Sequence, residues 1–291
     1  MNKISIVLIV LAVVIIVGAV VLIYRDHGGS AVLTSPVGSQ INLPTQAEIQ
    51  QVAPGWRVIS MGEINSSQVL SGLYPNADSL YQEYIQAPGV NGSLVSISII
   101  HYPGKPNSTE SLPHVILGNY VIEVNSTGNV SPTTTQGILS LAKSVFNGHN
   151  GTPIEIPSFI YPSSPNLPLV EYVVDNITSQ QGNFTQYSAY FVASTAQSGE
   201  SVGVDVLHGL NSTKLYNYLY STTVVPASGN TSSHSLAVNG TLNGARYFNL
   251  SINGTFGETF YYVGLKGNYV VLIQAQPSSA FQIFEYIIEK L

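Results

Sequence analysis

The sequence of 291 residues contains no cysteine and very little charge, and both absences narrow what the chain can do. Without cysteine there is no disulfide, no thiol nucleophile, no Cys-ligated zinc, no iron–sulfur cluster and no blue-copper site. Only 8% of the residues are charged, against about 25% in an average soluble chain. Nine basic residues and a net charge of −6 argue against nucleic acid as a partner.

Neutral side chains supply the polarity that charged residues supply in other proteins, chiefly Asn, Ser, Thr, Gln and 18 Tyr. An acidic medium protonates carboxylates, whereas it leaves hydroxyls and amides unchanged. We therefore expect an acid-adapted, archaeal-like chain of the kind that works on the surface of a thermoacidophile. Unfolding between about pH 4 and pH 2, where carboxylates titrate, would contradict this expectation.

The sequence also lacks the closely spaced residue sets that mark metal and cofactor sites. Its 15 carboxylates are scattered, and it has no phosphate-binding loop, dinucleotide fingerprint or calcium loop. No two histidines have the spacing of a metal-binding pair; they are His27, His101, His114, His149, His208 and His234. We predict no cofactor, no metal site and no catalytic residue that the sequence can identify.

One short motif favours a different interpretation, an extracellular acid-tolerant hydrolase. Residues Gly199–Gly203 match the G-x-S-x-G pattern, in which a serine at a strand-to-helix turn acts as nucleophile. Asp205 and either His208 or His234 would complete a Ser, Asp, His order. A strand is predicted after Ser201 instead of a helix, so an ordinary turn is the preferred interpretation.

The N-terminal segment Ile4–Tyr24 is apolar and carries no charge over 21 residues. As a helix it would be about 31 Å long, the thickness of the hydrocarbon core of a bilayer. We predict an uncleaved single-pass transmembrane helix at residues 1–24, which contacts lipid through residues 4–24. A cleaved signal peptide is the alternative, although its apolar core would normally be about 7–15 residues long.

The most informative feature of the sequence is its content of N-glycosylation sequons. Thirteen occur, where about four are expected by chance from the composition. Because sugars are attached on the far side of a membrane, these sequons predict an extracellular C-terminal domain and an N-terminus inside. The alternative is that Asn, Ser and Thr are merely abundant in loops. The predicted acceptors are Asn65, Asn91, Asn107, Asn125, Asn129, Asn150, Asn176, Asn183, Asn211, Asn230, Asn239, Asn249 and Asn253.

The pattern of apolar residues predicts an α+β fold, a mostly antiparallel β ectodomain with a few covering helices. Residues 25–44 are rich in Gly, Ser and Pro and predict a flexible tether. We expect extracellular lobe 1 at residues 45–150 and lobe 2 at residues 151–291, joined by a proline-rich connector at Ile154–Leu169. Strands are also expected around Leu236–Val238, Ala245–Ile252 and Thr259–Val263.

The two lobes share an order of elements, and two diverged repeats are one interpretation of it. Each has a hairpin, then a strand that starts Gly-Asn-Tyr-Val, then a proline and an amphipathic helix. The hairpins are Leu80–Ala87 with Ser93–Tyr102, and Tyr187–Ser194 with Ser201–Leu207; the later strands are Gly118–Ile122 and Gly267–Ile273. The first helix should start at Ser131 and Pro132, and the second after Pro277. Convergence on common turn chemistry is the alternative.

Tyrosines in lobe 2 suggest a groove for a glycan or a partner protein, because tyrosine stacks on sugars and contacts proteins at little entropic cost. Three lie near a short helix predicted at Thr213–Tyr220, and four on predicted strands. They are Tyr216, Tyr218 and Tyr220, then Tyr247, Tyr261, Tyr262 and Tyr269. Half-buried strand positions, which favour tyrosine, are the alternative explanation.

We expect a cell-membrane protein with an extracellular glycoprotein domain that binds, scaffolds or assists a partner of the cell envelope. Such a partner should use the sequon-free stretches Gln186–Leu210 and Phe256–Leu291. Two alternatives stay open: a membrane-tethered solute-binding protein with its ligand between the lobes, and the hydrolase described above.

Overall fold

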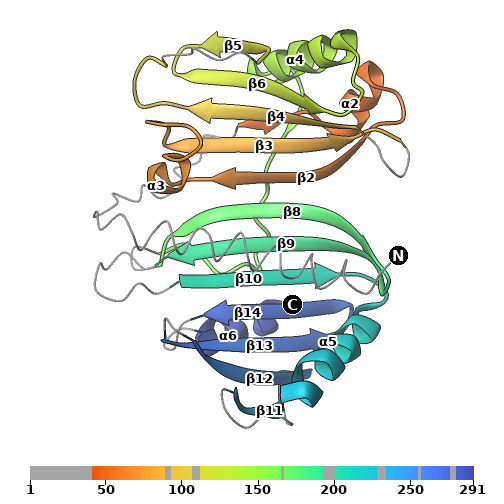
Figure 1. Cartoon of the computed structure of the whole chain (residues 1–291), viewed down its shortest axis with the longest axis vertical. Coiled ribbons are helices and arrows are strands. Elements are labelled where there is room, and N and C mark those ends of the chain that lie inside the picture. The colour runs from red at the N-terminus through yellow and green to blue at the C-terminus, as the bar shows by residue number, and fades with distance from the viewer. Residues whose placement is uncertain are drawn as a thin grey trace. The chain divides into compact units, whose positions relative to one another are not determined.

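The computed structural model describes residues 41–88, 93–106, 112–164, 167–192, 201–227, 234–254, 257–275 and 280–291. The predicted anchor and most of the predicted tether lie outside these ranges. None of the described helices is both long and apolar enough to cross a membrane. Antiparallel strands dominate, with a few helices packed on them, as the sequence predicts (Figure 1).

The chain divides into two compact units. Among the described residues, unit 2 comprises 41–155 together with Glu171–Asp175, and unit 1 comprises Ile156–Val170 with Asn176–Leu291. The short piece Glu171–Asp175 belongs to unit 2 because it pairs with a strand of that unit, Ser60 opposite Asp175 and Ile64 opposite Glu171.

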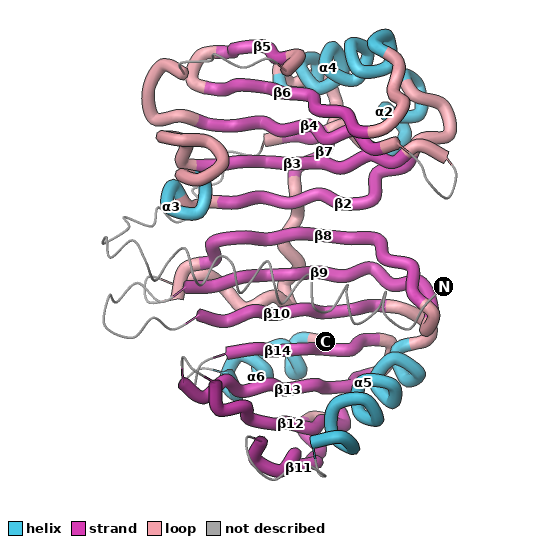
Figure 2. The backbone as a smooth tube through the Cα atoms, viewed as in Figure 1, coloured by secondary structure: helices cyan, strands magenta, loops and turns pink. Residues whose placement is uncertain are grey.

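Unit 2 is an antiparallel sheet in the order β8-β2-β3-β4-β6-β5, and Figure 2 shows its strands in magenta. A separate two-stranded sheet pairs β1 with β7. The strands are β1 (Asn42–Leu43), β2 (Arg57–Ile64), β3 (Ser79–Gln86), β4 (Leu94–His101), β5 (His114–Leu117), β6 (Tyr120–Thr127), β7 (Thr152–Pro153) and β8 (Leu169–Ser179). The helices are α2 (Gln46–Val52), α3 (Ser67–Leu70) and α4 (Pro132–Phe146).

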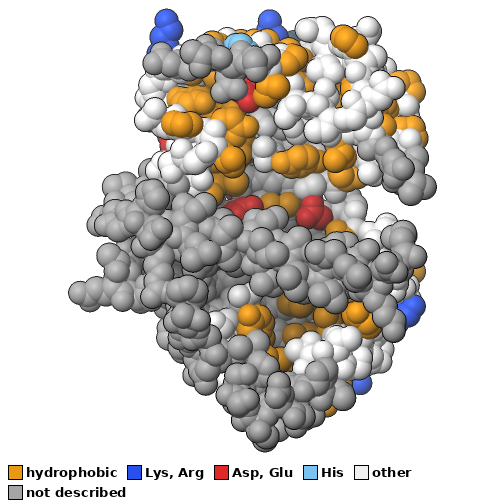
Figure 3. Space-filling model, in the orientation of Figure 1, with side chains coloured by type: hydrophobic (Ala, Val, Ile, Leu, Met, Phe, Trp, Pro, Cys, Tyr) orange, Lys and Arg blue, Asp and Glu red, His pale blue; other side chains and the backbone are white. Residues whose placement is uncertain are grey.

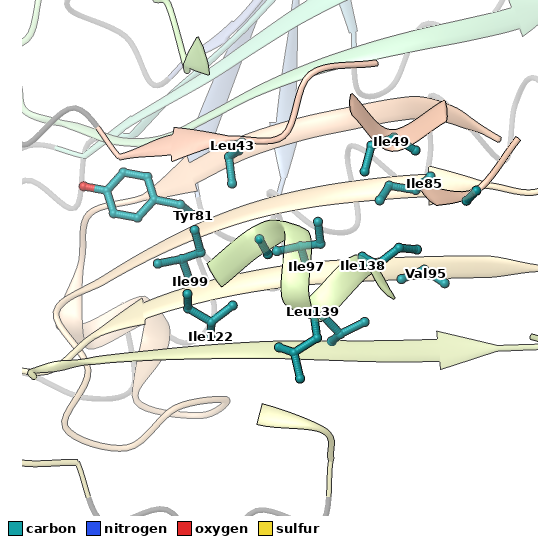
Figure 4. Close-up of a cluster of buried hydrophobic side chains, with 13 residues drawn as sticks. Leu43, Ile49, Tyr81, Ile85, Val95, Ile97, Ile99, Ile122, Ile138 and Leu139 are labelled. Carbon is teal, nitrogen blue, oxygen red and sulfur yellow. The ribbon is translucent and has the colours of Figure 1, made fainter. Parts of the chain in front are cut away.

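The core of unit 2 lies between one face of this sheet and helices α2 and α4 (Figure 4). Alternate residues of β3, β4 and β6 point into it, because successive strand residues face opposite sides. Val95, Ile97 and Ile99 of β4 are fully buried there, with Ile138 of α4. On the other face a smaller apolar cluster packs around Leu70 of α3.

Unit 1 is an antiparallel sheet in the order β8-β9-β10-β14-β13-β12-β11. Its further strands are β9 (Gly182–Val192), β10 (Ser201–His208), β11 (His234–Leu242), β12 (Ala245–Gly254), β13 (Gly257–Lys266) and β14 (Tyr269–Ala275). Its helices are α5 (Ser212–Ala227) and α6 (Ala280–Lys290). The predicted short helix is therefore longer than expected and continues past Tyr220.

Helices α5 and α6 cover opposite faces of the unit 1 sheet (Figure 1). On β12, Phe248 packs in a cluster with α5, whereas the ring of the neighbouring Tyr247 contacts Phe284 of α6 at a tilt. Gly264 of β13 leaves the space that the Phe284 ring fills, since a Cβ there would lie 2.7 Å from Phe284 Cζ. Both faces are therefore apolar, as expected for a sheet covered on both sides.

The strand before α4 in unit 2 and the strand before α6 in unit 1 begin with the same pair of residue types. His101 of β4 is opposite Tyr120 of β6, and His208 of β10 is opposite Tyr269 of β14. Each ring pair is in contact, with centroids 4.6 Å and 4.5 Å apart. The preceding Gly-Asn turns carry a glycine of positive φ, 62° at Gly118 and 55° at Gly267, as a two-residue hairpin of type II′ requires.

Candidate functional site

Three predicted glycan acceptors lie close together at one corner of unit 1. Asn176, Asn183 and Asn211 are all exposed. They come from β8, β9 and the turn before α5, and the β8–β9 hairpin brings them together. A Cβ at Gly182 would lie 2.5 Å from Asn211 Nδ2, and the hydroxyl of Thr185 donates to Asn176 Oδ1 at 3.2 Å. The Nδ2 atom of Asn176, to which a sugar would be attached, does not take part in that bond.

Four further acceptors are exposed elsewhere. Asn125 lies on β6 and Asn129 in the turn before α4. Asn150 has φ of 63°, a left-handed conformation that asparagine tolerates in turns. Asn239 is exposed on β11, where its Nδ2 donates to the Tyr220 hydroxyl at 3.2 Å. A sugar at any of these positions would extend from a turn or a strand surface into solvent.

Asn65 differs from these acceptors because it is buried. It is 9% exposed, and its Nδ2 donates to Glu63 Oε1 at 3.1 Å. This is the atom that would carry the glycan, so a sugar there would take one of the two hydrogens of a buried amide and would need space among buried side chains. Asn249 on β12 is half-buried, and its Oδ1 is buried without a hydrogen-bond partner. A sequon by itself says nothing about burial, so the sequence could not separate these two from the rest.

The remaining predicted acceptors cannot be placed on a surface. Asn91, Asn107 and Asn230 lie outside the described residues, and for Asn253 only its position on β12 is described.

The arrangement of β10 does not assemble the serine-hydrolase site. Ser201 begins this strand and His208 ends it, so they lie about 23 Å apart at the rise of about 3.3 Å per residue of an extended strand. Asp205 instead accepts hydrogen bonds from Gln186 Nε2 at 2.8 Å and from the Ser188 hydroxyl at 2.5 Å. His234 begins β11, which β12, β13 and β14 separate from β10 in the strand order. The serine therefore has neither of the proposed partners needed to activate it.

The described histidines lie apart from one another, and their contacts are with aromatic and polar neighbours. His101 Nδ1 lies 2.6 Å from Asp78 Oδ1, and Ser79 donates its hydroxyl to the same carboxylate oxygen at 3.1 Å. His208 is exposed and stacks on Tyr269. Nowhere in the described part of the chain do three His, Asp or Glu side chains come together as a metal site would need.

Two of the three tyrosines of α5 pack against the sheet. Tyr216 is 7% exposed and contacts Phe248, and Tyr220, one turn later, contacts the same ring edge-on. Tyr262 stacks on Phe284 of α6. These rings belong to the two cores of unit 1, which favours the structural explanation for them over a ligand groove.

Four carboxyl groups of unit 2 have raised pKa values. Burial raises the pKa of Glu63 and that of Asp175, and burial followed by the charge of Asp175 raises the pKa of Glu171. Burial and then the charge of Glu48 raise the pKa of Glu83 to about 8. Figure 3 shows how few other charged side chains appear on the described part of the face in view.

Glu48 behaves in the opposite way. Burial works against its ionisation, but hydrogen bonds from Thr45 and from the Gly151 backbone outweigh it and lower the pKa. The Thr45 N–H donates to Glu48 Oε2 at 2.7 Å, and the Thr45 Oγ1 accepts from the Glu48 N–H at 3.3 Å. This reciprocal capping box starts α2.

Comparison of the chain with protein-family models, with curated proteins and with solved structures found no match.

Proposed function

We propose that this chain is a single-pass, membrane-anchored extracellular glycoprotein that acts as a binding, scaffolding or accessory protein of the cell envelope. In this proposal residues 4–24 hold it in the bilayer, and N-linked glycans cover its extracellular domain. The proposal assigns it no catalytic activity.

The observation that carries the proposal is the exposure of seven sequon asparagines, distributed over both units. They lie in turns and on strand surfaces where an attached sugar would disturb no packed core. An excess of sequons with this distribution is what an exported, glycosylated domain requires. Unselected sequons would also fall at buried positions, and among those with described burial Asn65 alone is buried.

The partner binds through surface that sugars leave free. The two sequon-free stretches, Gln186–Leu210 and Phe256–Leu291, meet in unit 1, because β10 pairs with β14 along their length. On this surface Ser188 and Asp205 are half-buried, and the buried Gln186 donates to both through its Nε2.

The two units also derive from one ancestral unit by duplication. The support is the matched pairing of His101 with Tyr120 and of His208 with Tyr269. It extends to the backbone, where the Tyr102 N–H donates to Asn119 O at 2.9 Å and the Gly209 N–H donates to Asn268 O at 3.0 Å. Unit 1 then differs by the insertion of α5, β11 and β12 between its hairpin and its last two strands.

Purification of the native protein from membranes, followed by glycopeptide mass spectrometry, tests the proposal. We expect sugars on Asn176, Asn183 and Asn211, and an N-terminus that still includes residues 4–24. Crosslinking of the same material should map partner contacts to Gln186–Leu210 or Phe256–Leu291. Unmodified asparagines at the exposed corner, or a mature N-terminus beyond residue 24, would overturn it.

A further inference from the structure

Glu83 occupies a position in unit 2 where a carboxyl group is not expected. It lies on β3 between Tyr81 and Ile85, on the face that packs against α2 and α4 (Figure 4 labels both neighbours). It is 0% exposed, and neither carboxyl oxygen has a hydrogen-bond partner. Its opposite residues on the flanking strands are Met61 and Ile97, both apolar.

No cation compensates this carboxyl group. The titratable groups that face this core are Glu48 of α2, Glu63 of β2, Tyr81 of β3 and Tyr120 of β6. The cations of the same elements lie elsewhere: Arg57 of β2 and Lys143 of α4 are exposed, and His101 at the end of β4 is bound to Asp78. From α4 the core receives Thr135, Ile138, Leu139, Ala142 and Val145, and from β4 and β6 it receives aliphatic side chains and the ring of Tyr120. Because an ionised carboxylate in such a place would lose its hydration without any replacement, the folded unit holds Glu83 in its neutral form.

The capping box of α2 strengthens this preference. It keeps Glu48 ionised through hydrogen bonds from Thr45 and Gly151, so a fixed negative charge acts on Glu83. The position of Glu83 in β3 has a counterpart in unit 1. In unit 2 Glu83 is opposite Ile97, and two residues away Tyr81 is opposite Ile99. In unit 1 Ala189 is opposite Val204, and two residues away Tyr187 is opposite Val206. At the position in unit 1 that matches Glu83 there is therefore an alanine and no carboxyl group.

We propose that Glu83 makes unit 2 an acid-dependent fold, which stays closed while this carboxyl is protonated and opens when the medium takes the proton away. The opened form is one in which α2 and α4 no longer cover the sheet, so that water reaches the carboxylate. Unit 1 has no such group at the matching position and stays folded. This inference concerns the polypeptide alone and does not depend on glycosylation or membrane attachment.

The direction of the effect follows from proton linkage. In the open form Glu83 titrates near the ordinary pKa of 4.5, whereas in the closed form its pKa is raised to about 8. Between these values the closed form keeps a proton that the open form has lost, so opening becomes more favourable as the pH rises. In this window the equilibrium constant for opening increases about tenfold per pH unit, and outside it Glu83 contributes no slope.

Hydrogen exchange of the full chain, read peptide by peptide and corrected for the intrinsic rate at each pH, tests the proposal. Between about pH 5 and pH 7, the protection of β3 and β4 should fall at least about tenfold per pH unit. Peptides from β9 and β10 in unit 1 should keep their protection. In E83Q, which has the same shape and cannot ionise, the slope in β3 and β4 should fall by about one decade per pH unit, to what the raised pKa values of Glu63, Glu171 and Asp175 leave.

The control variant is E155Q, which removes an exposed carboxyl group of unit 2 and should follow the native protein. If E83Q does not fold, infrared titration of the native protein provides the second measurement. A protonated carboxyl band should persist above pH 6 and disappear together with protection. An identical slope in the native protein and E83Q, an equal loss of protection in unit 1, or no protonated carboxyl at pH 6 would overturn the proposal.

Discussion

At the scale of single residues, Gly264 shows how one missing side chain positions a helix. The Phe284 ring occupies the space above it, and Ile288 Cδ1 lies 3.3 Å from where a Cβ would be. Phe284 is fully buried and contacts both Tyr247 and Tyr262, so its ring cannot move aside freely. Helix α6 can therefore pack on β13 only while this position has no side chain.

Gly264→Ala should lower the free energy of unfolding by about 1–3 kcal/mol, the usual cost of overfilling a packed core. Urea denaturation followed by circular dichroism measures it. Gly72→Ala is the matched control, because no atom lies within 4 Å of a Cβ at that position. Equal midpoints for the two variants would show that α6 adjusts without cost.

Asn65 leads to a second prediction at this scale. Its amide is the hydrogen-bond donor that partly offsets the burial of Glu63. A sugar on Nδ2 would remove a donor N–H and would have to occupy space next to buried side chains. Glycopeptide analysis of the native protein should therefore find Asn65 unmodified while Asn125, exposed on β6, carries a sugar. Full occupancy at Asn65 would contradict the burial argument.

At the scale of secondary-structure elements, α4 is a helix whose first residue can be predicted from the sequence. Ser131 caps it by accepting from the Thr134 N–H at 3.1 Å, and Pro132 occupies the first turn. The cap satisfies a backbone donor that the helix itself leaves unpaired. Both features were predicted and are confirmed.

In protein produced without glycans, Ser131→Ala should therefore destabilise the protein by about 1 kcal/mol. Glycans are left out because Ser131 also completes the sequon of Asn129. Ser140→Ala in the same helix is the comparison, because that hydroxyl is exposed and bonds only to Gln136 O. Such bonds inside a helix contribute little, so this variant should match the native protein in thermal unfolding. A loss that is the same in both variants would indicate a general effect of the helix surface and not of the cap.

The elements that the sequence predicts well are those with a strong local pattern. The hairpins formed by β3 with β4 and by β9 with β10 alternate or run apolar, and their predicted bounds differ from the observed ones by a few residues or less, except at the start of β9. Strand β2 was missed because its residues are mostly half-buried and Gly62 interrupts it. Helix α2 could have been found, since Thr45 and Glu48 form a capping-box sequence.

The end of α5 and the burial of Glu83 could not be predicted from the local sequence, for two different reasons. Ser221 and the four residues after it are weak helix formers, so the prediction ended at Tyr220, whereas α5 continues to Ala227. Glu83 reads as an ordinary polar position in a strand. Only the pairing of β3 with both β2 and β4 places its side chain in the core.

At the scale of the whole molecule, the buried carboxyl groups together make the folded state more stable at acidic pH than at neutral pH. Glu63, Glu83, Glu171 and Asp175 all have raised pKa values in the fold, so each holds a proton that the unfolded chain releases first. Their combined effect is a stability that falls as pH rises above their ordinary values. Glu48 has the opposite sign and costs stability only where the pH falls through its lowered pKa.

The melting temperature of the full chain should therefore be higher at about pH 4.5, near the ordinary carboxyl pKa values, than at pH 7.5. Scanning calorimetry at the two values measures it. A fold held by ionised pairs would show the reverse order, with a loss of stability on acidification. A higher melting temperature at pH 7.5 would exclude the acid-adapted interpretation of the composition.

Trp56 is the sole tryptophan of the chain, and it packs, half-buried, against the core of unit 2. Excitation at wavelengths that tyrosine does not absorb therefore yields fluorescence from one unit alone. Its emission maximum will shift to the red when the α2 region is hydrated, whatever the other unit does. The protein thus contains an intrinsic optical probe for half of itself, and no label has to be attached.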